Sequence, residues 1–377
     1  MKIVVAPDKF RGSLEADEVC QAMVEGIHAV YPDAEVVAIP LADGGEGTAK
    51  ALTLQAGGEF VSVQVFDPMA RSIDATYGLS PDQKTAYIEM ASASGLWLLD
   101  LKDRDPAKTT SYGTGQVIAD ALNRGVDHII LGIGGSATND AGVGIAAALG
   151  YKFFDSKGEE LPPNGENLIH IHSIDGKYAH RRLGKVDITV ACDVTNPLYG
   201  DDGASMVYAP QKGANAESTY LLDQGLRNLA RVACKTFGED YSRVPGAGAA
   251  GGVGAGAKWF LNAKLEAGAS IVLRETRIEE QIKNADLVIT GEGKMDHQTL
   301  QGKLVLGLAG ICSAHQVPIA VVCGTLAITP KEVKQAGIAY ATSIINAPMS
   351  LEKAQKESFR LVSDATFHLT SLFFSGK

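Results

Sequence analysis

Apolar residues recur along this chain in two spacings, one typical of buried strands and one typical of helices. Residues 3–6 form an unbroken apolar run that predicts a buried strand. Residues 14–29 carry apolar side chains at helical spacing behind Ser13, a suitable N-cap. A second strand at 35–40 and a second helix at 47–56 follow. Alternation of strand and helix is typical of a parallel sheet, so the chain opens as an α/β domain.

The pattern changes after residue 60, where three short apolar segments follow one another without a helix between them. They are residues 61–66, 72–79 and 85–90, and they are separated by turn-forming residues. Consecutive strands joined in this way predict an antiparallel meander. Mixed elements are expected next, with helices at 115–123 and 141–148 and strands at 128–131 and 187–190.

From residue 286 onward, strands and helices alternate again as they do at the start of the chain. The expected elements are strands at 287–290, 319–323 and 340–345, a helix at 304–314 and a long amphipathic helix at 351–374. We therefore expect an α/β fold in which residues 1–62 and 285–377 form a Rossmann-like parallel-sheet domain. A second, mixed α/β domain, residues 63–284, would be inserted into it, with the active site in the interdomain cleft.

The composition is that of an ordinary globular protein, with 45% hydrophobic and 21% charged residues in a chain of 377. The net charge of −10 argues against nucleic acid as the main partner, because phosphate backbones bind to basic faces. No apolar run approaches the ~20 residues that cross a bilayer, so no membrane partner is expected. Five scattered cysteines without a C-x-x-C pair indicate neither disulfides nor zinc, and favour a cytoplasmic location.

The most unusual stretch is residues 245–256, of which six are glycine and four alanine. A helix is expected to follow at 257–267. Glycine lets backbone N–H groups approach a ligand closely, and N–H groups at the start of a helix bind anions. The stretch therefore favours phosphate binding, although a flexible tether or a tight helix-packing turn would have the same composition.

Five further loops combine glycine with polar side chains, most of them at the expected end of a strand, where open parallel sheets bind ligands. They are residues 7–13, 43–48, 131–142, 191–197 and 290–303. The loop at 131–142 offers N–H groups and hydroxyls that suit a phosphate. The other four add carboxylates that suit a hydroxyl or a metal ion, and the loops at 7–13 and 290–303 also add cations that suit an anionic group. Each can also be interpreted as an ordinary capped or polar turn.

Several common motifs do not occur in the sequence. There is no G-x-x-x-x-G-K-[ST] loop, no protein-kinase H-R-D or D-F-G element and no G-x-S-x-G turn. The spacing Gly246-x-Gly248-x-x-Gly251 matches the dinucleotide fingerprint, but no expected strand precedes it. Glycine loops for a nucleotide, acids for magnesium and an acid for a hydroxyl proton favour phosphoryl transfer to a small anionic acceptor.

Taken together, the loops resemble the bacterial glycerate kinase family of the glycerate 2-kinase type over essentially the whole chain. The motifs are APD at 6–8, ADGGEGT at 42–48, IEMASASGL at 88–96, TTSYGTG at 109–115, GGSATND at 134–140, CDVTNPL at 192–198, PQKGA at 210–214, PGAGAAGG at 245–252 and ITGEG at 289–293. The chain departs from the family pattern at three positions: Lys9 where serine is usual, Arg11 where lysine is usual, and Lys294 where arginine is common.

The resemblance implies transfer of the ATP γ-phosphate to the 2-hydroxyl of D-glycerate, with Mg²⁺, giving 2-phosphoglycerate and ADP. It also implies a two-domain α/β protein with an inserted domain, in agreement with the pattern of elements. The expected partners are ATP and D-glycerate, with no nucleic acid and no membrane. A homo-oligomer is compatible with this picture.

Roles for individual residues follow as hypotheses. Substrate binding is assigned to Asp8, Lys9, Arg11, Asp43 and Glu46. The glycerate carboxylate would meet Arg11 or Lys9. Asp193 would be the general base or the magnesium ligand, with Asp296 as its catalytic partner. The nucleotide phosphates are assigned to Gly134, Gly135, Ser136, Thr138, Asn139, Gly248, Gly251, Gly252 and Glu292.

Three alternatives stay open at this stage. The same kinase acting on the 3-hydroxyl would give 3-phosphoglycerate. A non-catalytic regulator would bind glycerate or nucleotide without releasing ADP. A nicotinamide-dependent oxidoreductase would use the glycines of the dinucleotide match.

Overall fold

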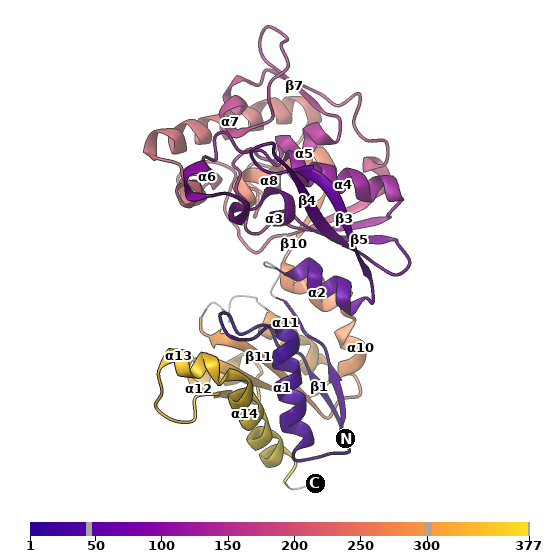
Figure 1. The fold of residues 1–377 in the computed structure, drawn as a ribbon, viewed down its shortest axis with the longest axis vertical. Coiled ribbons are helices and arrows are strands. Elements are labelled where there is room, and N and C mark those ends of the chain that lie inside the picture. Colours follow the sequence, from indigo (N-terminus) through magenta and orange to yellow (C-terminus); the bar gives the residue numbers. More distant parts are fainter. Residues whose placement is uncertain (43–46, 298, 300–303, 376–377) are drawn as a thin grey trace. The chain divides into compact units, whose positions relative to one another are not determined.

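The computed structural model describes residues 1–42, 47–297, 299 and 304–375. The chain divides into two compact units: residues 1–43 with 269–377, and residues 44–268 (Figure 1). The second unit is thus an insertion within the sequence of the first. Both units are α/β, so the predicted class is confirmed.

The first unit is built on a five-stranded sheet with the order β13-β12-β11-β1-β2, in which every neighbouring pair is parallel. Its strands are β1 (Lys2–Val5), β2 (Glu35–Ala38), β11 (Leu287–Met295), β12 (Ile319–Leu326) and β13 (Tyr340–Ser343). Ile3 pairs with Leu287, so the first strand of the chain lies next to one that begins far along the sequence. The apolar runs predicted as buried strands are buried here, as a parallel sheet with covered faces requires.

Helices cover this sheet. α1 (Ala16–His28) and α14 (Ser358–Phe373) pack against each other (Figure 1). Their close approach requires Gly26, because a Cβ atom at that position would clash with the carbonyl oxygen of Ser363. The remaining helices are α9 (Gly268–Glu275), α10 (Ile278–Ile282), α11 (Leu304–Ala314), α12 (Pro330–Gln335) and α13 (Leu351–Lys356).

The second unit contains a six-stranded sheet with the order β10-β9-β6-β5-β4-β3. Its strands are β3 (Glu59–Phe66), β4 (Ser72–Leu79), β5 (Thr85–Glu89), β6 (His128–Gly132), β9 (Asp187–Ala191) and β10 (Lys264–Glu266). β3, β4 and β5 pair antiparallel, which confirms the predicted meander, whereas β5, β6, β9 and β10 run parallel. A separate two-stranded sheet pairs β7 (Lys152–Phe154) with β8 (Ser173–Asp175).

The helices of the second unit are α2 (Thr48–Gln55), α3 (Ala91–Ser94), α4 (Tyr112–Arg124), α5 (Val143–Ala148), α6 (Ala204–Tyr208), α7 (Ala216–Phe237) and α8 (Ala249–Leu261). α2 contacts β4 and β5, so it belongs to this unit and not to the first. α10 contacts α11, so the chain rejoins the first unit before residue 285. The division therefore falls at 43/44 and 268/269, earlier at both places than the expected 62/63 and 284/285.

Two helix ends differ from expectation for local reasons. α1 is capped by Glu15, which forms a capping box with Glu18, and not by Ser13, whose hydroxyl donates to the carbonyl of Phe10. The expected helix at 351–374 is two helices, because the helical pattern is interrupted at Glu357 between α13 and α14.

The helix expected at 257–267 is correct only for residues 257–261, which form the end of α8. α8 begins within the glycine-rich stretch at Ala249 and contains a left-handed break at Ala250, Gly251 and Gly252. It ends at Leu261, where Asn262 takes a left-handed conformation, and the chain then forms β10. The other expected elements are present with shifted ends. In the part of the chain that the structure describes, no helix has the length and apolar character needed to cross a membrane.

Candidate active site

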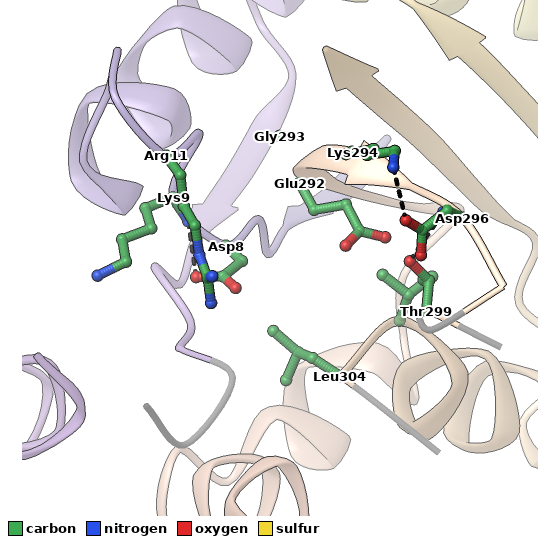
Figure 2. A pocket seen from close by; sticks show the side chains of 10 residues that line it. Asp8, Lys9, Arg11, Glu292, Gly293, Lys294, Asp296, Thr299 and Leu304 are labelled. Carbon is green, nitrogen blue, oxygen red and sulfur yellow. Dashed lines mark hydrogen bonds and ion pairs between the residues drawn. The ribbon is translucent and has the colours of Figure 1, made fainter. Parts of the chain in front are cut away.

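The first unit contains a cavity of about 470 Å³ at the carboxyl ends of β1 and β11. Figure 2 shows charged side chains from two segments around it. The loop after β1 contributes Asp8, Lys9 and Arg11, and the segment from β11 onward contributes Glu292, Gly293, Lys294, Asp296, Thr299, Leu304 and Val305. The cavity therefore brings Asp8, Lys9 and Arg11, which the sequence predicts to bind substrate, together with Asp296, which lies more than 280 residues later in the chain.

The loop after β1 is held in place by backbone hydrogen bonds and one buried ring. The Asp8 amide donates to the carbonyl of Gly291 at 2.8 Å, which fastens the loop to β11. The Asp8 carboxylate accepts from the Lys9 amide at 2.7 Å. Phe10 is buried in the core of the unit, so its neighbours Lys9 and Arg11 are left at the surface of the cavity. The loop thus fixes one carboxylate and two cations.

The opposite wall is strand and not loop, contrary to the expected strand end at residue 290. β11 continues to Met295, and Lys294 and Met295 pair with Thr325 and Leu326 of β12. Met295 is fully buried, whereas the Lys294 ammonium forms an ion pair with Asp296 at 3.0 Å. Rigid strand geometry therefore positions the charges of this wall.

Three cations and three carboxylates line this cavity, which suits a small molecule carrying both an anionic group and hydroxyls. Lys9, Arg11 and Lys294 can meet an anion, and the carboxylates can accept from hydroxyl groups. Glu292, assigned from the sequence to the nucleotide phosphates, lies here with the substrate group. The predicted residues Asp43 and Glu46 lie outside the described residues.

The second unit contains a separate cavity of about 430 Å³. Its wall includes the loop after β6, namely Gly134, Gly135 and Ser136, and the loop after β9 with Asp193. The remaining lining residues are Leu96, Ile133, Ala191, Cys192, Val194, Tyr208, Gln211, Lys212, Ala249 and Ala250. Three of the predicted phosphate-binding residues and one predicted catalytic acid are therefore brought together in this unit.

Lys212 is the one cation that lines this cavity among the described residues, and it is 3% exposed. Its ammonium donates to the Ser136 hydroxyl at 2.7 Å and to the Thr138 carbonyl at 2.7 Å. Burial lowers the pKa of Lys212 to about 7, and the negative charge of Asp140 opposes that shift. A nearly buried lysine is thus held at the base of the glycine loop.

Asp140 is fully buried behind the same loop. Its carboxylate accepts from the amide and hydroxyl of Ser111, at 2.8 and 2.7 Å, and from the amides of Gly142 and Gly144, at 3.0 and 3.3 Å. Burial raises the pKa of Asp140, and these hydrogen bonds oppose the rise because they favour the charged form. Asp140 therefore connects the loop to the starts of α4 and α5.

The predicted phosphate residues Thr138 and Asn139 lie behind the cavity wall, since both are fully buried and neither lines the cavity. The Asn139 amide donates to the Ser205 hydroxyl at 3.0 Å. A Cβ atom on Gly251 would clash with the Thr138 carbonyl and one on Gly248 with that of Pro197.

Gly252 is likewise in contact with its neighbours and faces Leu198 and Ala141. These glycines serve close packing of the glycine-rich stretch against the segments after β6 and β9, which is the packing-turn interpretation left open above. Ala249 and Ala250 are the residues of the stretch that reach the cavity.

Asp193 is exposed and lies two residues beyond the end of β9, and its carboxylate accepts from the Gly268 amide at 2.9 Å. No group of three or more His, Cys, Asp or Glu residues in the described ranges is close enough to hold a metal ion by itself. Mg²⁺ commonly uses one or two carboxylates together with phosphate oxygens and water, so the exposed carboxylate of Asp193 fits such an ion. Asp193 and Asp296, predicted as a catalytic pair, belong to different units.

Two residues received no role from the sequence. Lys212 lies in the P-Q-K-G motif, and Asp140 closes the G-G-S-A-T-N-D motif. A lysine between glutamine and glycine gives no sign of burial, because lysine is almost always exposed. The sequence feature that could have indicated a role for Lys212 was its position in the PQKGA motif at 210–214.

Comparison with known proteins assigns the chain to a family. The model of the glycerate kinase family matches residues 3–373. The chain belongs to this family. It is 45% identical to the glycerate kinase of Bacillus cereus over 94% of this chain and 93% of that protein. It is 42% identical to the glycerate 2-kinase of Escherichia coli K12 over 100% of this chain and 99% of that protein.

A solved structure agrees with this assignment. The crystal structure of a Salmonella typhimurium LT2 protein assigned as glycerate kinase 2 matches with a TM-score of 0.91 at 42% identity. The match covers 100% of this chain and 99% of that one. Membership in the glycerate kinase family confirms the resemblance stated from the motifs, and it makes the chain a kinase.

The buried ammonium of Lys212 gives a testable effect of pH on stability. Its pKa of about 7 in the folded chain lies below the ordinary lysine value of 10.5, so between these values the unfolded chain binds more protons. Burial of the charged Lys212 ammonium therefore lowers the free energy of unfolding by its full amount below pH 7, and this loss disappears as the pH approaches 10.5. We expect Lys212→Met to gain stability relative to wild type at pH 6, and this gain to shrink by up to ~1.4 kcal/mol per pH unit above pH 7.

Urea unfolding of both proteins between pH 6 and 9 measures this difference. As a matched control, Lys235→Met removes an exposed lysine of the same unit and should change the free energy of unfolding by less than about 0.5 kcal/mol. A difference between Lys212→Met and wild type that stays constant over this pH range would contradict a buried, depressed lysine.

Proposed function

We propose that this kinase transfers the γ-phosphate of ATP to the 2-hydroxyl of D-glycerate, with Mg²⁺, giving 2-phosphoglycerate and ADP. The observation that carries the proposal is the 42% identity over the full length with a protein named glycerate 2-kinase. The two cavities support it chemically. One gathers paired charges suited to a small hydroxy acid, and the other combines a glycine loop with a buried cation.

In this proposal the cavity of the first unit binds glycerate. Arg11, or Lys9 beside it, binds the carboxylate of the substrate, because a guanidinium or ammonium gives a charge-assisted hydrogen bond. The Asp8 carboxylate accepts a hydrogen bond from a hydroxyl group of the substrate. Asp43 and Glu46 retain the substrate-binding role expected from the sequence.

The cavity of the second unit binds the phosphates of the nucleotide. Gly134 offers an open approach, since nothing lies within 4 Å of the position that a Cβ atom would take. Gly135 has a φ of +68°, which glycine adopts without strain, and it turns the loop beside the Ser136 hydroxyl. Behind this loop Thr138, Asn139, Gly248, Gly251 and Gly252 act by packing.

Asp193 would hold Mg²⁺, which supplies charge neutralisation for the transferring phosphoryl group. An acid of the site takes the proton of the 2-hydroxyl, for which Asp193 and Asp296 are the candidates. The hydroxyl oxygen then forms the new bond to the γ-phosphorus. The bond from that phosphorus to the bridging oxygen of ADP breaks, and ADP leaves with the electron pair.

Product analysis tests the proposal directly. The protein is incubated with ATP, Mg²⁺ and D-glycerate, and the product is identified by ³¹P NMR and by coupling to enolase without a mutase. Formation of 2-phosphoglycerate supports the proposal. Formation of 3-phosphoglycerate moves the reaction to the other hydroxyl, and binding of both substrates without release of ADP indicates a regulator.

Removing the charge of Asp193 tests its catalytic role. Asn in its place keeps an oxygen that can accept from the Gly268 amide but is neither a base nor a strong magnesium ligand. We expect Asp193→Asn to lower kcat by about 100-fold or more, the scale of lost acid–base help. Steady-state kinetics with the exposed Asp201→Asn as control measures this effect. Near-normal turnover of Asp193→Asn would remove Asp193 from catalysis.

The role of Arg11 is tested by comparing how its replacement changes the KM for glycerate and the KM for ATP. We expect Arg11→Ala to raise the KM for glycerate by at least about 10-fold, because a charge-assisted hydrogen bond contributes about 1.5–3 kcal/mol. The KM for ATP should change little, and Arg11→Lys should recover part of the loss. An effect on ATP alone would instead place Arg11 on the nucleotide side. Arg360→Ala, on the exposed surface of α14, is the matched control.

A further inference from the structure

Lys212 is a buried cation whose two hydrogen-bond partners, the Ser136 hydroxyl and the Thr138 carbonyl, are neutral. Its ammonium has three N–H bonds, and two of them donate to a hydroxyl and a peptide carbonyl. In the described part of the chain no carboxylate lies within ion-pair distance of it, and the charge of Asp140 acts from further away. Burying a charge is costly unless an opposite charge accompanies it. The base of this cavity is therefore short of negative charge.

The loop beside Lys212 has the remaining features of an anion site. Gly134 and Gly135 are exposed in the cavity wall, and within the described residues their amides have no backbone or side-chain acceptor. The Ser136 hydroxyl accepts from Lys212, so its own proton is available for a further hydrogen bond. An ammonium, a hydroxyl and two amides thus gather at one end of the cavity.

The fold fixes this group of donors from behind. Asp140 follows the loop and anchors the starts of α4 and α5 through four hydrogen bonds. The Thr138 carbonyl, on the same segment, accepts from Lys212. The cation and the loop therefore keep one arrangement before any ligand binds, which lowers the entropy that binding would lose.

We infer that Lys212 is a phosphate-binding residue of this kinase: its ammonium, held by Ser136 and Thr138, donates to a phosphate oxygen of the nucleotide in the cavity of the second unit. Asp140 is a positioning residue for it. The inference rests on the proposed function for the identity of the nucleotide. The ligand chemistry that Lys212 recognises is a polyphosphate, and lysine meets such groups as a point charge.

Direct titration tests this role. Binding of ADP, inorganic tripolyphosphate and adenosine is measured by calorimetry for wild type, Lys212→Met and the surface control Lys235→Met. We expect Lys212→Met to lose at least 10-fold in affinity for ADP and tripolyphosphate, with adenosine affinity changed less than twofold. Lys235→Met should match wild type. Unchanged tripolyphosphate and ADP affinity in Lys212→Met overturns the inference, and so does an equal loss for adenosine.

Kinetics separate this inference from the proposed function. If wild type makes phosphoglycerate, Lys212→Met should raise the KM for ATP by at least 10-fold while the KM for glycerate changes less than twofold. A wild-type protein that makes no phosphoglycerate sinks the proposed function, and the tripolyphosphate titration still decides the role of Lys212. Asp140→Asn should weaken tripolyphosphate binding less than Lys212→Met does, because the ammonium remains.

A second measurement needs only the wild-type protein, in case Lys212→Met does not fold. The titratable groups around this cavity are Lys212, Asp140, Asp193, Cys192 and Tyr208. Phosphate beside the ammonium favours its charged form, so ADP binding at pH 8.5 should take up close to one proton. Calorimetry in buffers of different ionisation enthalpy measures the uptake. Absence of proton uptake would overturn contact between Lys212 and phosphate.

Discussion

A single buried carboxylate organises the second unit around its cavity. Asp140 receives hydrogen bonds from the Ser111 amide and hydroxyl and from two glycine amides, and it thereby joins the loop after β6 to α4 and α5. The same negative charge partly offsets the buried ammonium of Lys212. A buried ion that loses its hydrogen-bond donors is strongly destabilising. The shape of the glycine loop and the charge at its base therefore depend on the same group.

The sequence predicts most of the sheet architecture, because buried parallel strands and an antiparallel meander leave clear apolar patterns. It does not predict that β11 continues through Gly291, Glu292, Gly293 and Lys294, which are poor strand formers. Pairing with β12 overrides their propensity. α7 was also not predicted. It contains Gly225, which is unfavourable in a helix but lies against Leu168 in the packed unit.

The lining of the two cavities was predictable where charged or glycine residues follow strands, as with Asp8 and Gly134. It was not predictable where burial decides the role. In the sequence, the glycines of the 245–256 stretch resemble a phosphate-binding loop. In the structure, several of them lie so close to a backbone carbonyl that a side chain would not fit. Lys212 shows the converse, since nothing local in its sequence marks a lysine that is almost fully buried.

The pairing of β1 with β11 also shapes how the chain reaches its native state. The Lys2 amide bonds to the Asp286 carboxylate across 284 residues of sequence, whereas every strand of the second unit comes from one continuous segment. During translation, residues 44–268 can fold as a unit before β11, the partner strand of β1, has been synthesised. The apolar strand β1 therefore has one edge without a hydrogen-bonded partner until most of the chain has been translated. Closure of a long chain loop is thus inherent in this topology.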